Sequence, residues 1–179
     1  FLIVFILLWG IQSFSKADDI SEFEIDGMSV GDSALEFFSD NVLNNNLIKD
    51  YSSDRYVTAS INLSPEKEYE FVQLSYLKKD KKKILADING IVDLEFNKCL
   101  ERLKELEIDF DNLFSNVKKL GMDTYEHALD KSGKSKITDI VWQFNNGDVA
   151  IIACYNWSEE MGYPDEFRVA IGNKDFDNF

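Results

Sequence analysis

The residues that could do chemistry in this chain are mostly carboxylates. Asp and Glu number 33 among 179 residues, and hydrolysis of a glycosidic bond needs two carboxyl groups, one as acid and one as base or nucleophile. So many acids create chance pairs, and we interpret neighbours such as Asp109 and Asp111 as solvated surface charge. A periplasmic hydrolase that cleaves a glycan with paired carboxylates is therefore an alternative without a specific motif.

His127 is the only histidine in the sequence. A metal centre with two His ligands is therefore excluded, and two thiols without a nearby His make a poor zinc site. No Ser or Cys beside His127 stands in the context of an activated nucleophile. We interpret His127 as a partly exposed structural residue, with a general-base role as the alternative.

Two short motifs lack the residues that their chemistry needs. Residues 133–135 (Gly-Lys-Ser) resemble the end of a phosphate-binding loop, but Ala128 stands where the first glycine belongs. The stretch that begins at Asp130 resembles a calcium loop, but its fifth and twelfth positions hold Lys134 and Val141 in place of oxygen ligands. We expect no cofactor, no specific metal site and no catalytic residue that the sequence can identify.

Aromatic side chains are denser near the C-terminal end than elsewhere. The set comprises Trp142, Phe144, Tyr155, Trp157, Tyr163 and Phe167. On two paired strands, alternate members could line one face, because side chains alternate along a strand. The candidate binding face is Trp142, Tyr155 and Trp157, suited to a sugar or a peptide, and the alternative is that these residues belong to the core.

The charge balance limits the partners. Lys and Arg number 19 against 33 acidic residues, for a formal net charge of −14. A surface that negative repels phosphate backbones and anionic lipids. We therefore expect no nucleic-acid partner, and an envelope protein, a peptide or a glycan as the partner.

The first 17 residues predict an export signal. Phe1–Trp9 is an unbroken apolar run, which as a helix would rise only about 14 Å, roughly half of a hydrocarbon core. This length is typical of the apolar region of a signal peptide, and Ser15 and Ala17 supply the small residues of a cleavage site. We predict cleavage after Ala17 and a periplasmic or secreted domain of residues 18–179, without stable membrane insertion; a buried strand is the alternative.

Two cysteines, Cys99 and Cys154, predict one disulfide bond. An exported chain meets an oxidising compartment, and the separation of these residues excludes a CxxC redox motif. A bridge across this loop would stabilise the fold by roughly 4 kcal/mol in the chain-entropy model. The alternative is two buried free thiols.

Period-two alternation with aromatic and β-branched residues predicts six main strands. They cover residues 56–63, 69–77, 84–92, 137–144, 149–157 and 166–172. Residues 145–148 (Asn-Asn-Gly-Asp) predict a tight hairpin, because Asn-Gly tolerates positive φ at both central positions. A further short strand is expected at residues 22–25.

Three helices complete the expected elements. Ser29 and Asp32 resemble a capping box at the start of a short helix, and Ser39 caps a second one that runs to residue 48. Apolar residues from Phe96 to Val117 recur every three or four positions, which predicts a long amphipathic helix that ends near Gly121. Without βαβ alternation the fold class is α+β: a mainly antiparallel sheet of about six strands, one long amphipathic helix and two short N-terminal helices.

Residues 25–35 read Ile-Asp-Gly-Met-Ser-Val-Gly-Asp-Ser-Ala-Leu. With the apolar N-terminus, this block resembles a group of short uncharacterised exported bacterial proteins, which implies an exported domain and assigns no residue a role. The Gly-Met-Ser start is more distantly similar to small envelope-assembly lipoproteins and to β-lactamase-inhibitor-like domains. The chain lacks their lipid-bearing Cys and their Leu-Leu-Gly helix end.

The functional expectation is a non-enzymatic exported binding protein or cell-envelope-associated protein. It depends on the signal peptide, the disulfide and the lack of a catalytic constellation. The alternatives are the glycan hydrolase and an exported enzyme inhibitor.

Overall fold

The computed structural model describes residues 19–49 and 53–176. Its helices are a 3₁₀ turn at Ile20–Glu22, α1 (Ala34–Phe37), α2 (Asp40–Asn45) and α3 (Phe96–Leu113). Its strands are β1 (Leu47–Ile48), β2 (Tyr56–Asn62), β3 (Phe71–Leu77), β4 (Leu85–Asp93), β5 (Lys118–Glu126), β6 (Lys136–Gln143), β7 (Val149–Asn156) and β8 (Glu166–Gly172). The predicted signal peptide, residues 1–17, lies outside the described residues.

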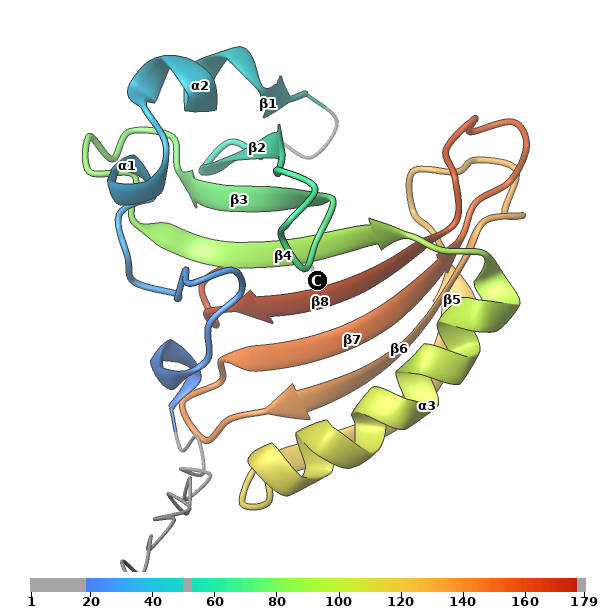
Figure 1. Cartoon of the computed structure of the whole chain (residues 1–179). Helices are drawn as coiled ribbons and strands as arrows, with labels where there is room; N and C mark the ends of the chain where they lie inside the picture. The colour runs from blue at the N-terminus through green and yellow to red at the C-terminus, as the bar shows by residue number, and fades with distance from the viewer. Residues whose placement is uncertain (1–18, 50–52, 177–179) are drawn as a thin grey trace, which may run out of the picture.

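All eight strands form one antiparallel sheet with the order β1-β2-β3-β4-β8-β7-β6-β5. Each half of the chain contributes a meander in which consecutive strands pair. The two meanders meet where β4 pairs with β8, and α3 carries the chain from the middle of the sheet to its far edge (Figure 1). The α+β class and the antiparallel sheet are confirmed.

The expected number of about six strands is wrong, because β1 and β5 were not predicted. The long helix was expected to run to about residue 120, but it ends at Leu113, and Lys118 to Glu126 form a strand. Residues 118–126 form a strand because they pair with β6, where Lys119 lies opposite Trp142. Gly121, with φ +86°, lies at an irregularity within β5 and does not cap the helix.

The N-terminal segment is also built differently from the expectation. Residues 22–25 form no strand; a bridge between Ile25 and Met28 closes a turn there. The backbone N–H of Ser29 donates to Asp32, as in a capping box, but α1 begins later, with Ser33 as its N-cap. Tertiary burial of Ile25 and Met28 explains the difference, because both are nearly inaccessible to solvent.

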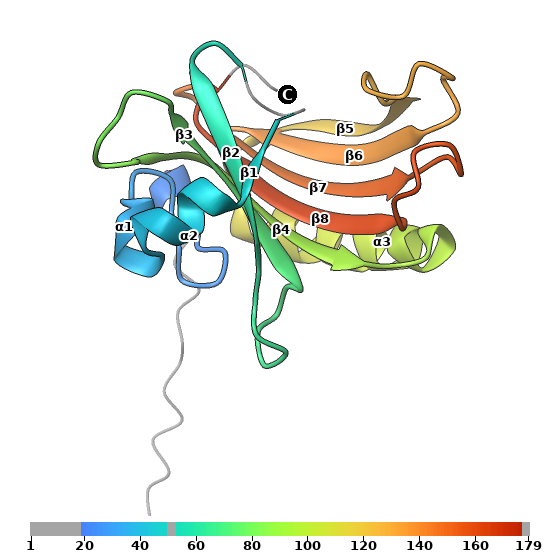
Figure 2. The same cartoon turned by 90° about the horizontal axis from the view of Figure 1, so that it is seen from above.

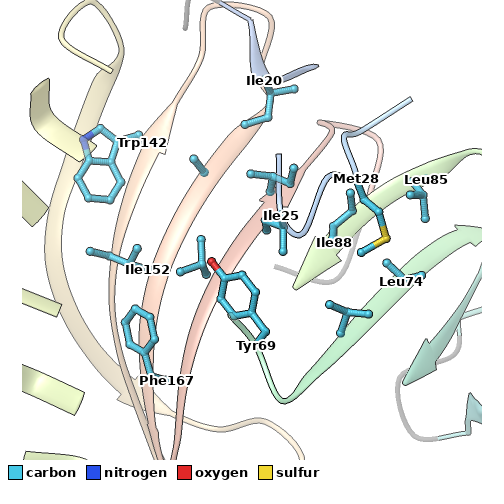
Figure 3. Close-up of a cluster of buried hydrophobic side chains, with 14 of the residues drawn as sticks. Ile20, Ile25, Met28, Tyr69, Leu74, Leu85, Ile88, Trp142, Ile152 and Phe167 are labelled. Atoms are coloured by element: carbon cyan, nitrogen blue, oxygen red, sulfur yellow. The ribbon is translucent and has the colours of Figure 1, made fainter. Parts of the chain in front are cut away.

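One face of the sheet carries the main core. Ile20, Ile25 and Met28 of the N-terminal segment belong to one cluster of buried side chains with residues of the strands, among them Trp142 and Ile152 (Figure 3). α3 packs on β7 and β8 on the same face. Burial of these apolar side chains is the main favourable contribution to folding.

The opposite face, which we call the open face, is not covered by a helix over β5 to β8 (Figure 2). Alternation along the strands places on it Arg168 of β8 together with its neighbours Ala153 of β7 and Ile91 of β4. Many of its side chains are polar and nevertheless buried. Buried polar side chains therefore distinguish the open face from the apolar core face.

The predicted disulfide bond is confirmed. Cys99 on α3 is bonded to Cys154 on β7, with 5.7 Å between their Cα atoms. Both residues are fully buried on the core face. The bond fixes the first turn of α3 to the centre of the second meander.

Among the described residues, none of the helices is both long enough and apolar enough to cross a bilayer. The longest of them, α3, has 18 residues with many charged side chains.

Replacing both Cys99 and Cys154 with Ala should lower the free energy of unfolding by about 2–4 kcal/mol, because the unfolded chain regains the freedom of a 55-residue loop. Urea unfolding followed by tryptophan fluorescence measures this change. Reduced wild-type protein is the matched control and should unfold at a similarly lowered urea concentration. An unchanged midpoint for the double variant would show that the bond contributes nothing to stability.

Candidate functional site

A cavity of about 400 Å³ opens on the open face. Its lining comes from β1, β2, β3, β4, β8 and the loop before β8: Ile48, Ser60, Phe71, Gln73, Asp93, Trp157, Tyr163, Pro164, Glu166 and Arg168. Ile48 and Trp157 line the same cavity although four strands lie between β1 and β7 in the sheet. The sheet is therefore strongly curved, and the curvature forms the cavity.

A buried ion pair lies within the cavity wall. The guanidinium of Arg168 donates to Glu166 from Nε at 2.8 Å and from a terminal nitrogen at 2.6 Å, and it also donates to Gln73 at 3.3 Å. It lies over the ring of Tyr155 at 4.0 Å from the centroid. Arg168 is only 4% exposed, so its orientation is fixed by contacts on several sides.

Alternation along β8 explains how a buried arginine is tolerated here. Phe167 and Val169 point into the main core, whereas Glu166 and Arg168 point to the open face. Because the two charged residues are two positions apart on one strand, they are neighbours on that face. A buried charge needs such a partner and additional hydrogen bonds.

The cavity has aromatic walls. Trp157 and Tyr163 meet with ring centroids 5.1 Å apart, and Phe71 on β3 is a further aromatic lining residue. His127 packs on Trp157 with a centroid separation of 4.4 Å. The rings of His127 and Tyr163 hold the indole in place.

His127 is buried, and the expectation that it would be partly exposed is wrong. Its Nδ1 accepts a hydrogen bond from the backbone N–H of Leu129 at 3.2 Å. Burial, followed by the nearby Arg168, lowers the pKa of His127. The imidazole is therefore neutral at neutral pH, with its proton on Nε2, and it serves to position Trp157.

Asp130 connects the loop between β5 and β6 to the loop that follows β7, at the end of the sheet next to the cavity. Its carboxylate accepts hydrogen bonds from the backbone N–H and the hydroxyl of Ser135 and from the hydroxyl of Ser158. Hydrogen bonds donated by Ser135 and Ser132 hold the pKa of Asp130 well below its ordinary value. Asp130 is therefore a structural anion, and the described residues contain no cluster of three or more His, Cys, Asp or Glu side chains that could hold a metal ion.

An exposed carboxylate stands at the rim. Asp93 ends β4 and lies directly across from Glu166 in the pairing with β8. Its backbone N–H donates to Glu70 at 3.3 Å. Partial burial and the negative charge of Glu70 raise the pKa of Asp93. The carboxyl groups of Asp93 and Glu70 therefore lie close together at the rim of the cavity.

A second buried acid, Asp87, lies further along the open face on β4. Its Oδ2 accepts hydrogen bonds from the hydroxyl of Ser75 and the amide of Asn89, while its Oδ1 has no hydrogen-bond partner among the described residues. Burial raises the pKa of Asp87 to about 8. The carboxyl group is therefore mostly protonated at neutral pH.

The structure brings together two of the three residues of the candidate binding face. Tyr155 and Trp157 lie on the open face with ring centroids 5.7 Å apart. Trp142 lies on the core face, 1% exposed, between Phe110 and Phe114. The candidate face thus does not include Trp142.

The length of a hairpin loop causes this separation. A two-residue loop at residues 146–147 would pair Trp142 with Ile151 and place Trp142 on the same face as Tyr155. In the structure the N–H of Phe144 donates to the carbonyl of Asp148, and Trp142 pairs with Ala150. Within this hairpin only Gly147 has positive φ. The pairing of the two strands is shifted by one residue from that of a two-residue loop, and this shift moves Trp142 to the other face of the sheet.

Sequence reasoning missed Arg168, Glu166, Gln73 and Phe71 as site residues. The available signal was one charged residue, Arg168, in the middle of a strand whose other central residues are apolar. A charge at such a position needs a buried partner. The partner on β3 could not be identified, because β3 and β8 are joined only through β4.

Comparisons of the chain with protein-family models, with curated proteins and with solved structures found no match.

The Asp87→Asn variant should alter how stability depends on pH. The unfolded chain releases this proton near pH 4, whereas the folded protein keeps it until about pH 8. The stability contributed by the protonated group is therefore complete below pH 4 and is lost as the pH rises to 8. Relative to wild type, the variant should gain about 1 kcal/mol per pH unit between pH 5 and 8. Urea unfolding from pH 5 to 9 tests this, and parallel profiles would refute it.

Replacing Arg168 with Met should lower the free energy of unfolding by about 3–5 kcal/mol, because it leaves the buried carboxylate of Glu166 without its partner. Adding Glu166→Gln should recover part of that loss. Lys134→Met is the matched control, since the Lys134–Glu160 pair is more than half exposed. Equal effects of Arg168→Met and Lys134→Met in urea unfolding would show that the buried pair is not coupled.

Proposed function

We propose that this chain is a non-enzymatic exported protein that binds a small ligand in the open-face cavity. The observation that carries the proposal is the cavity itself, about 400 Å³ with aromatic walls and the buried pair of Arg168 and Glu166. Small-molecule sites typically have roughly 300–1,000 Å³, apolar walls and a few fixed polar groups. The cavity has each of these properties.

The polar groups around the cavity are arranged to hold a ligand. Glu166 is bound to Arg168 by two hydrogen bonds, and Nδ1 of His127 is occupied by a backbone N–H. A general base must be free to take a proton from a substrate. Fixed groups of this kind orient a ligand without reorganisation, which favours binding.

The disulfide supports export. Bonds such as Cys99–Cys154 persist mainly in oxidising compartments. Together with the apolar run at Phe1–Trp9, this favours a cleaved signal peptide and a periplasmic or secreted location.

One observation favours a second candidate, a hydrolase that acts on a glycan. Asp93 and Glu166 are cross-strand partners that line the same aromatic cavity. Asp93 has a raised pKa, as a general acid requires, while Glu166 is held in an ion pair by Arg168. In this mechanism Asp93 would protonate the leaving oxygen and Glu166 would act on the sugar.

Native mass spectrometry of the protein purified from its own compartment tests the binding function. We expect the non-covalent mass of one small molecule, which disappears on denaturation. Ser60→Phe fills the cavity wall and should abolish the extra mass. Ser115→Phe, an exposed position in the turn after α3, is the matched control and should retain it.

The same experiment separates binding from hydrolysis. A binding protein releases the ligand chemically unchanged after repeated cycles of binding and dialysis. If the ligand is recovered as hydrolysis products and Asp93→Asn stops their formation, the hydrolase is correct. If wild type and Ser60→Phe bind the same mass, or neither binds any, the cavity is not the ligand site.

A further inference from the structure

We propose that the ligand of the open-face cavity is a neutral saccharide. This inference rests on the proposed binding function and adds the chemical class of the ligand. It follows from the signs of the charges at the cavity, from its aromatic walls and from its set of hydrogen-bonding groups.

The charges at the cavity disfavour an anionic ligand. The positive charge of Arg168 is already paired with Glu166, and Arg168 donates a further hydrogen bond to Gln73. Asp93 and the neighbouring Glu70 repel an anion, and the net charge of −14 adds to that repulsion. A ligand without net charge avoids this penalty.

The polar groups also disfavour a purely apolar ligand. Such a ligand would remove water from the exposed carboxylate of Asp93 and from the hydroxyl of Ser60 without replacing its hydrogen bonds, and this desolvation opposes binding. A neutral ligand must therefore carry several hydrogen-bonding groups of its own. Sugar hydroxyls meet this requirement, because each one both donates and accepts.

The hydrogen-bonding set of the cavity is mixed in the same way. The carboxylates of Asp93 and Glu166 only accept, the guanidinium of Arg168 only donates, and the amide of Gln73 and the hydroxyl of Ser60 do both. A row of hydroxyl groups can satisfy acceptors and donors alternately. An extended peptide offers its donors and acceptors along a line, which suits the edge of a sheet, whereas this cavity opens on the face of the sheet.

The aromatic walls provide the complementary apolar contact. A pyranose ring presents flat patches of C–H groups between its hydroxyls, and the rings of Trp157, Tyr163 and Phe71 offer apolar faces to such patches. The indole N–H of Trp157 has no hydrogen-bond partner among the described residues. This N–H is therefore a donor in a cavity-lining side chain that the described residues leave unused.

The test is calorimetric titration of the full-length mature protein with a defined panel of probes. The saccharides are glucose, galactose, mannose, N-acetylglucosamine and the β-linked dimers of glucose and N-acetylglucosamine. The comparison probes are choline as a cation, citrate as an anion and trialanine as a peptide. We expect saturable binding of at least one saccharide and no binding of the comparison probes.

Tyr163→Ala should weaken that binding at least tenfold, because it removes an aromatic wall that is 52% exposed and whose loss does not open the core. Tyr125→Ala is the matched control, since Tyr125 is similarly exposed at 45% and does not line the cavity. Its binding should equal that of wild type. Equal weakening by both variants would place the sugar elsewhere and overturn the proposal.

The failure of this inference differs from the failure of the binding function. If no saccharide binds, or if only choline, citrate or trialanine binds, the ligand class is wrong, whereas a bound native mass that Ser60→Phe removes would still support the cavity as a binding site. If neither a saccharide nor a native mass is found, both proposals fail.

Discussion

The pairing of β4 with β8 is the interaction on which the rest of the molecule depends. Seven residue pairs, from Asp87–Gly172 to Asp93–Glu166, join the two meanders into one sheet. The strands are far apart in the sequence, so this contact forms only after a large loop has closed, at a cost in chain entropy. The cavity spans this junction, with Phe71 on one side and Glu166 on the other. Fold and site therefore require the same long-range contact.

The two faces of the sheet carry different kinds of side chain. The core face holds apolar side chains, the disulfide and the ring cluster of Trp142, Phe110 and Phe114. The open face holds buried polar groups such as Asp87 and Arg168, which are costly unless partners satisfy them. The apolar core is thus concentrated on one face, and this allows the other face to keep buried polar groups.

Local patterns predicted the elements that have strong local signals. The alternation in residues 56–63 and 149–157 and the apolar side of the long helix each correspond to an observed element, and Cys99 and Cys154 gave the correct disulfide. β5 has no comparable signal, because an edge strand is mostly exposed and needs no apolar alternation. The identity of the site residues depended on one hairpin register and on the β4–β8 junction. Neither can be read from neighbouring residues alone.

The irregularity at Gly121 has a consequence for how copies of the protein meet one another. β5 is a nine-residue strand at the edge of the sheet, with a row of backbone groups that another chain could extend. The shift in pairing between Lys119 and Met122 breaks the even spacing of those groups. A second strand approaching this edge would find its register interrupted in the middle. The molecule thus carries its own protection against edge-to-edge aggregation.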